Sequence, residues 1–365
     1  MKRLAVSLLL VLSLVSVSFA QSLIGGRGAG MGGTGVAASK GLDAAYYNPA
    51  CLMRSEVSVA QVETGLGAAY TDVTDLSNAI SKANDPGQFV LDNYSKNLSF
   101  NGTVNGLIGA NVRKVGLSVI PMLLASVNKP AFSVGANVNA TGFYAGVLTL
   151  GHTFSVPFLP AALDVGANIK SINGIMGSAS ITANPADPTQ GSGSQTTATG
   201  AGLGFDVGVL TSFDIPFVTN FAAGLVLRDV STSYTMKPTT NTLTLDQTTG
   251  SIVKGPDTAQ PDQTVTVDST TAIGVAATIP VIGLEAAMDL EMTKNDGTNT
   301  HIGVSYGLLM NTIILRAGIA SGQNLGLTTF GAEVDARFAK IALVTASDSK
   351  NSGLTHAYAD ITIGL

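Results

Sequence analysis

The chain has 365 residues, a formal net charge of −5 and only 12% charged residues, against about 25% in soluble domains. A mildly acidic chain lacks the basic face that nucleic-acid binding requires, so no nucleic-acid partner is expected. The single cysteine, Cys51, excludes an intramolecular disulfide framework and any CxxC metal or redox site. Glycine contributes 42 residues, and no segment after the N-terminus has the ~18 unbroken apolar residues of a membrane helix. This composition favours a β-rich protein with a large lipid-facing surface.

The first twenty residues have the three parts of a secretory signal peptide. Lys2 and Arg3 are basic, residues 4–17 are apolar apart from serines, and Ser18-Phe19-Ala20 places small residues where a signal peptidase cleaves. Cleavage would leave Gln21 as the first residue of the mature chain. The alternative is an uncleaved N-terminal anchor, which would need a longer apolar run.

The next segment, residues 25–50, reads GGRGAGMGGTGVAASKGLDAAYYNPA. Gly28, Gly30 and Gly33 match the GxGxxG pattern of dinucleotide-binding proteins, but that motif needs a preceding strand and a following helix. Here the pattern comes directly after the export signal, so we expect no nucleotide and no other cofactor. Glycine permits positive φ and a close approach to surrounding walls, so we predict a tightly packed segment.

Residues 71–97 show no strand pattern. Leu76, Ala79 and Ile80 have helical spacing, and an Asp-Pro-Gly sequence at residues 85–87 interrupts it. We predict two short helices in an outer loop. They either contact a ligand or only cover the mouth of a barrel.

The most informative pattern is alternation with a period of two, which indicates β-strands. It begins in residues 98–113, where one face is apolar or small and the other is mostly polar. The apolar face contains Leu98, Phe100, Gly102, Val104, Gly106, Ile108, Ala110 and Val112. Successive residues of a strand point to opposite sides, so the two faces meet different surroundings.

The same alternation returns in the last hundred residues. It occupies residues 284–291, 301–308, 313–319, 331–338 and 358–365. Short turns are predicted near Lys114, Pro280, Asn311 and Lys340, and long polar loops at residues 71–97, 174–200, 236–262 and 348–355. Such segments are typical of membrane barrels, in which an even strand number puts both chain ends in the periplasm. We therefore predict an all-β fold, a closed antiparallel transmembrane β-barrel of about 14 strands with a range of roughly 12–16. An even total requires one strand fewer in residues 131–173 than the alternating runs alone suggest.

The glycine-rich segment carries a family resemblance. An Arg-Gly-x-Gly-Met-Gly-Gly sequence, followed by an aromatic residue before Asn-Pro-Ala, resembles the N-terminus of a broad group of outer-membrane proteins. This group includes FadL-type long-chain fatty acid transporters, PorV-like proteins and proteins named conjugal transfer protein TraF. Weaker similarity to the PorV-like and TraF-named members lies at residues 202–211, 223–229 and 301–318.

The resemblance implies a fourteen-stranded barrel with an N-terminal hatch in its lumen, whose rearrangement in FadL-type members opens a path for hydrophobic substrates. By position, the hatch residues are Arg27, Gly28, Gly30, Met31, Gly32, Gly33, Asn48, Pro49 and Ala50. The implied organisation is a signal peptide at residues 1–20, a hatch or plug at residues 21–55 and a barrel at residues 56–365. The alternative for Asn48-Pro49-Ala50 is a plain turn before the first strand.

Three features depart from this resemblance. Cys51 stands where the family usually has glycine after Asn-Pro-Ala, so the shape of that turn is open. Leu365 ends the chain where outer-membrane barrels commonly have an aromatic residue. The chain contains no tryptophan, so interfacial belts would depend on tyrosine and phenylalanine alone.

The polar faces of the C-terminal strands bring ten ionisable residues into the predicted lumen. These are Glu285, Asp289, Glu291, His301, Arg316, Glu333, Asp335, Arg337, His356 and Asp360. Opposite charges on neighbouring strands can lie side by side, and buried charges need partners or water. We predict a structural network that fills and stiffens the lumen, with guidance of a substrate as the alternative.

No catalytic or metal site is predicted. His152, His301 and His356 lack the spacing of metal ligands. The Gly-x-Ser-x-Gly sequence at residues 303–307 lies within an alternating strand segment, without the strand-to-helix turn of a nucleophile elbow. We expect a non-enzymatic outer-membrane protein that passes hydrophobic small molecules across the membrane. The alternative is a non-transporting PorV-like or TraF-like barrel that binds exported proteins or assists a secretion or conjugation system. A secreted soluble β-protein is the third hypothesis. Expected partners are outer-membrane lipid, the barrel assembly machinery, and either a hydrophobic small molecule or exported proteins.

Overall fold

The computed structural model describes residues 23–54, 58–70, 95–155, 161–184, 187–215, 218–246, 251–294, 297–350 and 355–364. The predicted signal peptide lies outside these residues, as does most of the loop for which two short helices were predicted, residues 71–94. No helix in the described part of the chain is long and apolar enough to cross a membrane.

The described residues form one antiparallel sheet of 17 strands, which confirms the predicted all-β class. Its long half contains β1 (Ser58–Tyr70), β2 (Leu98–Val112), β3 (Val115–Lys129), β4 (Gly135–Ser155), β5 (Ala162–Asn184), β6 (Asp187–Ile215) and β7 (Val218–Asp246). Three short strands follow, β8 (Ser251–Lys254), β9 (Thr258–Ala259) and β10 (Gln263–Thr266). The short half contains β11 (Thr270–Ile279), β12 (Leu284–Thr293), β13 (Gly297–Leu308), β14 (Ile313–Ser321), β15 (Gly326–Asp335), β16 (Ala339–Asp348) and β17 (Thr355–Gly364).

Strands that follow one another in the chain pair with one another. Consecutive pairing runs from β1 to β7, continues from β7 to β11, and then runs from β11 to β17. β17 also pairs with β1. The short strands β8, β9 and β10 pair with the C-terminal part of β7, residues 233–246.

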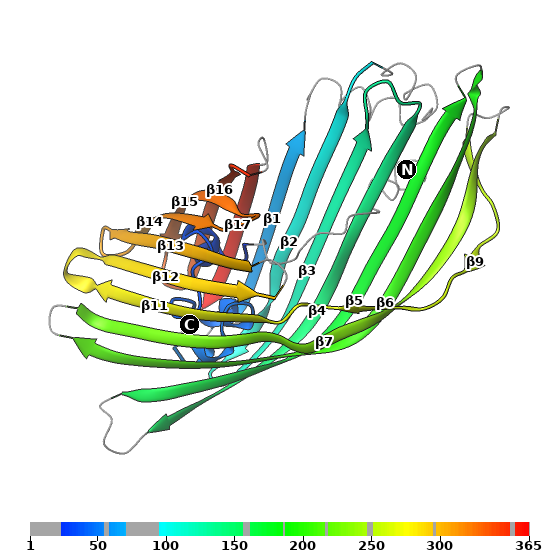
Figure 1. Ribbon diagram of the computed structural model, residues 1–365. Helices are drawn as coiled ribbons and strands as arrows, with labels where there is room; N and C mark the ends of the chain where they lie inside the picture. Colours follow the sequence, from blue (N-terminus) through cyan, green and yellow to red (C-terminus); the bar gives the residue numbers. More distant parts are fainter. Residues whose placement is uncertain are drawn as a thin grey trace.

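The two halves of the sheet differ greatly in height (Figure 1). β6 and β7 each have 29 residues, whereas β14 has 9 and β15 has 10. At ~3.3 Å per residue, β6 is about 95 Å long and β14 about 30 Å. One side of the molecule therefore extends far beyond the other.

This extension corrects the loops predicted at residues 174–200 and 236–262. β5 continues to Asn184, β6 begins at Asp187, and β7 continues to Asp246. Threonine is β-branched and favours extended backbone, and its hydroxyls pair across these strands. Thr196 and Thr240 hydroxyls lie 3.1 Å apart, and those of Thr197 and Thr239 lie 3.2 Å apart.

The alternation predicted in the sequence separates exposed from buried side chains. In β13, Ile302 and Val304 are exposed, while His301 and Ser305 are buried. In this strand the outward face is thus apolar and the inward face polar, the reverse of a strand in a soluble protein. The four predicted short turns join β2 to β3, β11 to β12, β13 to β14 and β15 to β16.

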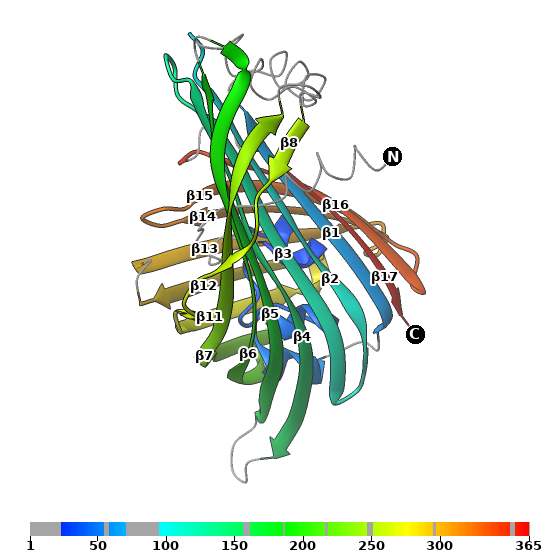
Figure 2. The same ribbon diagram turned by 90° about the vertical axis from the view of Figure 1, so that its right-hand side faces the viewer.

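The N-terminal segment, residues 23–54, contains three short helical elements enclosed by the strands (Figure 1, Figure 2). They are α2 (Gly26–Gly30), η2 (Gly41–Ala45) and η3 (Pro49–Arg54). α2 contacts β14 to β17, η2 contacts β1 to β4, and η3 contacts β4 to β6. Nearly all residues of this segment are buried. Its many small side chains let it fit inside the wall that the strands form.

Candidate functional site

The nine predicted hatch residues lie in two parts of the N-terminal segment. Arg27, Gly28 and Gly30 belong to α2, and the next two glycines, Gly32 and Gly33, have φ of 71° and 88°. This left-handed backbone favours glycine and turns the chain back after α2. The remaining members are Met31, Asn48, Pro49 and Ala50, all buried.

Strands β12 and β13 hold the turn after α2 through its backbone. Oδ2 of Asp289 accepts hydrogen bonds from the backbone N–H groups of Gly35, at 2.6 Å, and Val36, at 2.9 Å. Nδ1 of His301 lies 2.8 Å from the carbonyl oxygen of Gly32. A carbonyl only accepts, so this histidine nitrogen carries the proton.

α2 itself is held by charged side chains of the wall. Arg27 forms an ion pair with Glu285 of β12. Burial alone would lower the pKa of Arg27, but the charge and hydrogen bond of Glu285 raise it, so the guanidinium stays charged. Oδ2 of Asp360 in β17 accepts a hydrogen bond of 3.0 Å from the backbone N–H of Gly26.

Asn48 forms a defined turn before η3. Its Nδ2 donates to the carbonyl oxygens of Val36, at 2.8 Å, and Val209 of β6, at 3.2 Å. Its Oδ1 accepts from the backbone N–H of Ala50 at 3.0 Å. The amide thus joins two parts of the N-terminal segment to the wall, more than a plain turn would do.

Glycines of the wall lie where the N-terminal segment comes closest. A Cβ atom added at Gly208 would overlap the Asn48 side chain, and one at Gly166 would overlap the Pro49 backbone. A Cβ atom at Gly318 would overlap the Gly32 backbone. The wall therefore needs glycine at these positions to admit the segment.

Cys51 fills the position where the resembling proteins usually have glycine. Its thiol is fully buried and lies 3.4 Å from the carbonyl oxygen of Val36. Burial raises the pKa of the thiol to about 11. The small thiol therefore acts as a neutral packing group in the turn at Asn48.

The predicted network is divided into separate pairs. Arg316 and Glu333 form an ion pair of 2.9 Å between β14 and β15, and Glu291 pairs with Arg228. His356 stacks on Tyr358 with ring centroids 6.1 Å apart.

One predicted member of the network, Arg337 in the β15–β16 turn, is corrected. Arg337 lies in that turn with φ of 70°, exposed and beyond the end of β15. Asp335 ends the strand and pairs with Lys340 at 3.4 Å. The alternation of the sequence continues past the end of β15 at Asp335, where the backbone changes direction.

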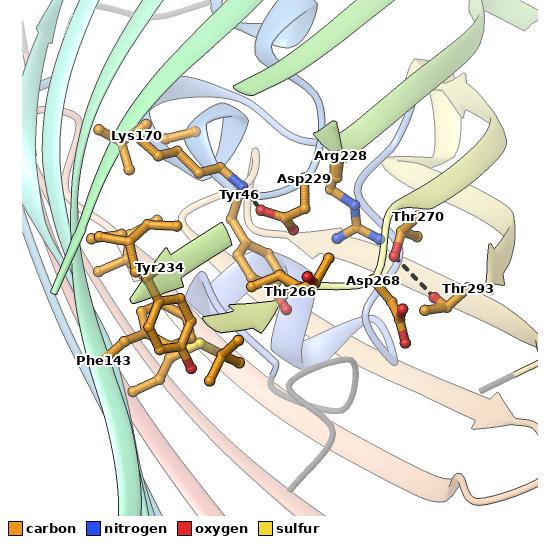
Figure 3. A pocket seen from close by; sticks show the side chains of 18 of the residues that line it. Tyr46, Phe143, Lys170, Arg228, Asp229, Tyr234, Thr266, Asp268, Thr270 and Thr293 are labelled. Carbon is orange, nitrogen blue, oxygen red and sulfur yellow. Dashed lines mark hydrogen bonds and ion pairs between the residues drawn. The ribbon is translucent and has the colours of Figure 1, made fainter. Parts of the chain in front are cut away.

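A cavity of about 310 Å³ lies between Tyr46 and the long strands (Figure 3). Its apolar lining is Ala45, Ile120, Met122, Phe143, Ala145, Val147, Ile172, Tyr234, Val265 and Val267. Its polar lining is Lys170, Arg228, Asp229, Thr266, Asp268, Thr270, Glu291 and Thr293. The cavity thus has an apolar part and a charged part.

The charged part depends on an irregularity in β7. The β6–β7 register shifts beside Phe205, and Asp229 and Ser231 have φ of 55° and 54°. The neighbours Arg228 and Asp229 therefore both line the cavity, which a regular strand would not allow. This site could not be predicted from the sequence, because alternation assigns adjacent residues to opposite faces.

Ion pairs connect the charged residues. Nζ of Lys170 lies 2.7 Å from Asp206 and 2.8 Å from Asp229. Arg228 pairs with Glu291, and its guanidinium carbon lies 5.7 Å from the ring centre of Tyr46. Both cations are therefore already paired within the protein. In the described part of the chain, no group of three or more His, Cys, Asp or Glu could hold a metal ion.

No protein-family model and no curated protein sequence matches the chain. Among solved structures, a FadL homologue of Pseudomonas aeruginosa matches 96% of this chain and 99% of its own, with a TM-score of 0.58 and 10% identity. The P. putida toluene transporter TodX matches 96% of this chain and 97% of its own, with a TM-score of 0.50 and 12% identity. A TodX mutant described as a monoaromatic hydrocarbon channel matches 93% of this chain and 99% of its own, with a TM-score of 0.55 and 12% identity.

These likenesses define the class of fold. The chain has the fold of FadL-like outer-membrane channels, which agrees with the FadL part of the resemblance. The similarity to PorV-like and TraF-named proteins stays a prediction.

Proposed function

We propose that this protein is an outer-membrane β-barrel through which hydrophobic small molecules cross the outer membrane. The observation that carries the proposal is the largely apolar cavity, which lies inside a wall whose outward face is also apolar. Ligand pockets are mostly apolar with a few polar groups, and this cavity has that character.

The proposed barrel comprises fourteen strands, β1 to β7 and β11 to β17, with β17 closing on β1. The pairings of β1 with both β2 and β17 support this closure. Residues 56–365 form the barrel and residues 21–55 form the plug. A closed barrel satisfies every backbone hydrogen bond without a free edge, as a membrane requires.

The exposed apolar face supports membrane insertion. It continues into the short turns, where the exposed fractions of Val281 and Phe338 are 91% and 70%. From Ile302 to Leu308 it spans about 20 Å along β13, or about 15 Å after a tilt of ~40°. The apolar band of such barrels is ~25 Å high, so the turns are needed to complete it. In water this surface would promote aggregation.

The N-terminal segment is proposed to act as the hatch. It adjoins the cavity through Ala45 and Tyr46, and single hydrogen bonds hold several of its backbone groups. Movement of this segment would open the cavity toward the periplasm, with the nine predicted hatch residues forming the moving part.

Uptake in cells tests the proposal. The full chain is expressed in a Gram-negative host without a channel of this type, and uptake of radiolabelled toluene is measured. Cysteines at Val36 and Ala272, which pack in one cluster, lock the hatch when oxidised, in a Cys51→Ala background. We expect uptake above the empty host, loss of that uptake on oxidation, and recovery on reduction.

Three results would contradict the proposal. Absence of the protein from the outer-membrane fraction would exclude the barrel. Equal uptake in locked and reduced states would exclude the hatch. Lack of uptake with co-purifying exported proteins would support the PorV-like alternative.

A further inference from the structure

We infer that the cavity beside Tyr46 accepts uncharged or cationic hydrophobic molecules and rejects anionic ones such as carboxylates. This inference rests on the proposed function, because it names the substrate class of the same cavity.

The apolar part of the cavity sets the size and shape of the ligand. An engineered apolar cavity of ~150 Å³ holds benzene, so about 310 Å³ leaves room for one aromatic ring with a substituent, or for a short alkyl chain. Phe143 and Tyr234 line this part together (Figure 3). Aromatic faces favour offset or edge contacts with a ring, which suits an aromatic ligand.

The charged part has more carboxylates than cations. Lys170 and Arg228 are the two cations, and the carboxylates that form ion pairs with them are Asp206, Asp229 and Glu291. Three negative groups against two positive groups leave an excess of one negative charge within these ion pairs. Asp206 is almost fully buried behind Lys170, so its charge is little screened by water.

Neither cation is free to receive an anion. Lys170 is held by two carboxylates at 2.7 and 2.8 Å, and Arg228 is held by Glu291. An incoming carboxylate would have to displace one of these pairs and leave a buried protein carboxylate uncompensated. The number of ion pairs would stay the same, while the ligand carboxylate and the displaced protein carboxylate would lie close together and repel each other.

Neutral and cationic groups find partners without such an exchange. Thr266, Thr270 and Thr293 line the cavity, and a hydroxyl group can both donate and accept, so a neutral hydroxyl finds a partner without breaking an ion pair. An ammonium group offsets the excess negative charge and can donate hydrogen bonds to the lining carboxylates of Asp229 and Glu291.

A matched ligand series tests this inference. The probes are benzyl alcohol, benzylamine and benzoate, which share one ring and differ in charge at neutral pH. Binding to the full-length protein in detergent is measured by calorimetry at low salt. We expect benzyl alcohol and benzylamine to bind at least about tenfold more tightly than benzoate. Benzoate binding as tightly as the other two would overturn the charge selection.

A variant that replaces the carboxylate beside Arg228 by a neutral amide provides a second test. Glu291→Gln frees Arg228, and we expect it to raise benzoate affinity relative to benzyl alcohol about tenfold. Glu333→Gln is the matched control, because it frees Arg316 of a different ion pair and should leave this ratio unchanged. Heat-modifiable migration checks that both variants fold. No change of the ratio in Glu291→Gln would overturn the inference.

The outcomes separate the two proposals. If none of the three probes binds, the proposed function of the cavity fails and the inference fails with it. If benzoate binds best, only the charge selection fails.

Discussion

The ammonium group of Lys170 in β5 lies 2.8 Å from the carboxylate of Asp229 in β7, although β6 separates the two strands. Asp206 of β6 completes the contact, at 2.7 Å from the same nitrogen. The backbone N–H of Asp229 also donates to Asp206 at 2.8 Å. This three-charge cluster therefore ties three strands together where the register of β6 and β7 shifts.

Replacing Lys170 should destabilise the protein strongly. Lys170→Met leaves Asp206 and Asp229 close together without a cation, and removing one partner of a buried ion pair costs about 3–5 kcal/mol. The measurement is the unfolding free energy in detergent. Lys254→Met is the control, because Lys254 at the end of β8 forms an exposed ion pair with Asp257. We expect no measurable change in the unfolding free energy of this variant. Equal stability of Lys170→Met and wild type would mean that the cluster contributes little.

Removing Asp289 should loosen the N-terminal segment without unfolding the barrel. Asp289→Ala leaves the backbone N–H groups of Gly35 and Val36 without their acceptor, at about 1–3 kcal/mol for each buried unsatisfied group. Hydrogen exchange of residues 30–40 should become faster while exchange of β13 stays slow. Asp335→Ala, at the end of β15, is the control. Unchanged exchange at Gly35 would show that other contacts hold the segment.

The thiol of Cys51 should report the position of the N-terminal segment. Because its pKa is raised to about 11, the thiol is protonated below that pH, and only about one thousandth is thiolate at pH 8. Maleimide labelling of the folded protein should be very slow at pH 8 and faster toward pH 10. Denaturation or Asp289→Ala should accelerate it. Labelling of the folded protein at the rate of a free cysteine would contradict this burial.

The faces of the wall could be predicted from the sequence, but the partners of its charges could not. Alternation depends only on neighbouring residues, so the exposed Ile302 and buried His301 follow from the pattern alone. The pair of Arg228 and Glu291 joins residues 63 positions apart across β11. Such a pair depends on strand order and register, which a single sequence does not contain.

The strand residues within 174–200 and 236–246 could not be predicted for a different reason. Residues 187–202 are polar or small on both faces, so no apolar period marks them as a strand. Their pairing comes from threonine hydroxyls and backbone hydrogen bonds, as between Thr196 and Thr240. These strands therefore have the polar and small residues that are typical of loops, so composition could not distinguish the two. The hatch role of Arg27 and the glycines after it stays a prediction, because buried packing alone does not demonstrate movement.

A methyl group added at Gly208 should disturb the turn at Asn48. The new Cβ would overlap Asn48 Oδ1, so the turn or β6 must shift, and overpacking of this kind costs about 1–3 kcal/mol. Gly146→Ala is the matched control, because a Cβ at Gly146 meets no atom within 4 Å. We expect lower stability and faster Cys51 labelling in Gly208→Ala, and neither change in Gly146→Ala. Equal behaviour of the two variants would mean that the segment does not press against β6.

An arginine on the outward face should destabilise the barrel according to its depth in the membrane. Leu315 in β14 is exposed and central in the apolar face, whereas Met310 lies in a turn at its edge. At the bilayer midplane an arginine costs about 2–4 kcal/mol, and near the interface about 0–1 kcal/mol. Folding into lipid vesicles from urea should therefore be destabilised more by Leu315→Arg than by Met310→Arg. If the wall faces water instead, both substitutions replace exposed apolar groups and change stability little. The difference between the two variants thus measures whether the apolar face contacts lipid.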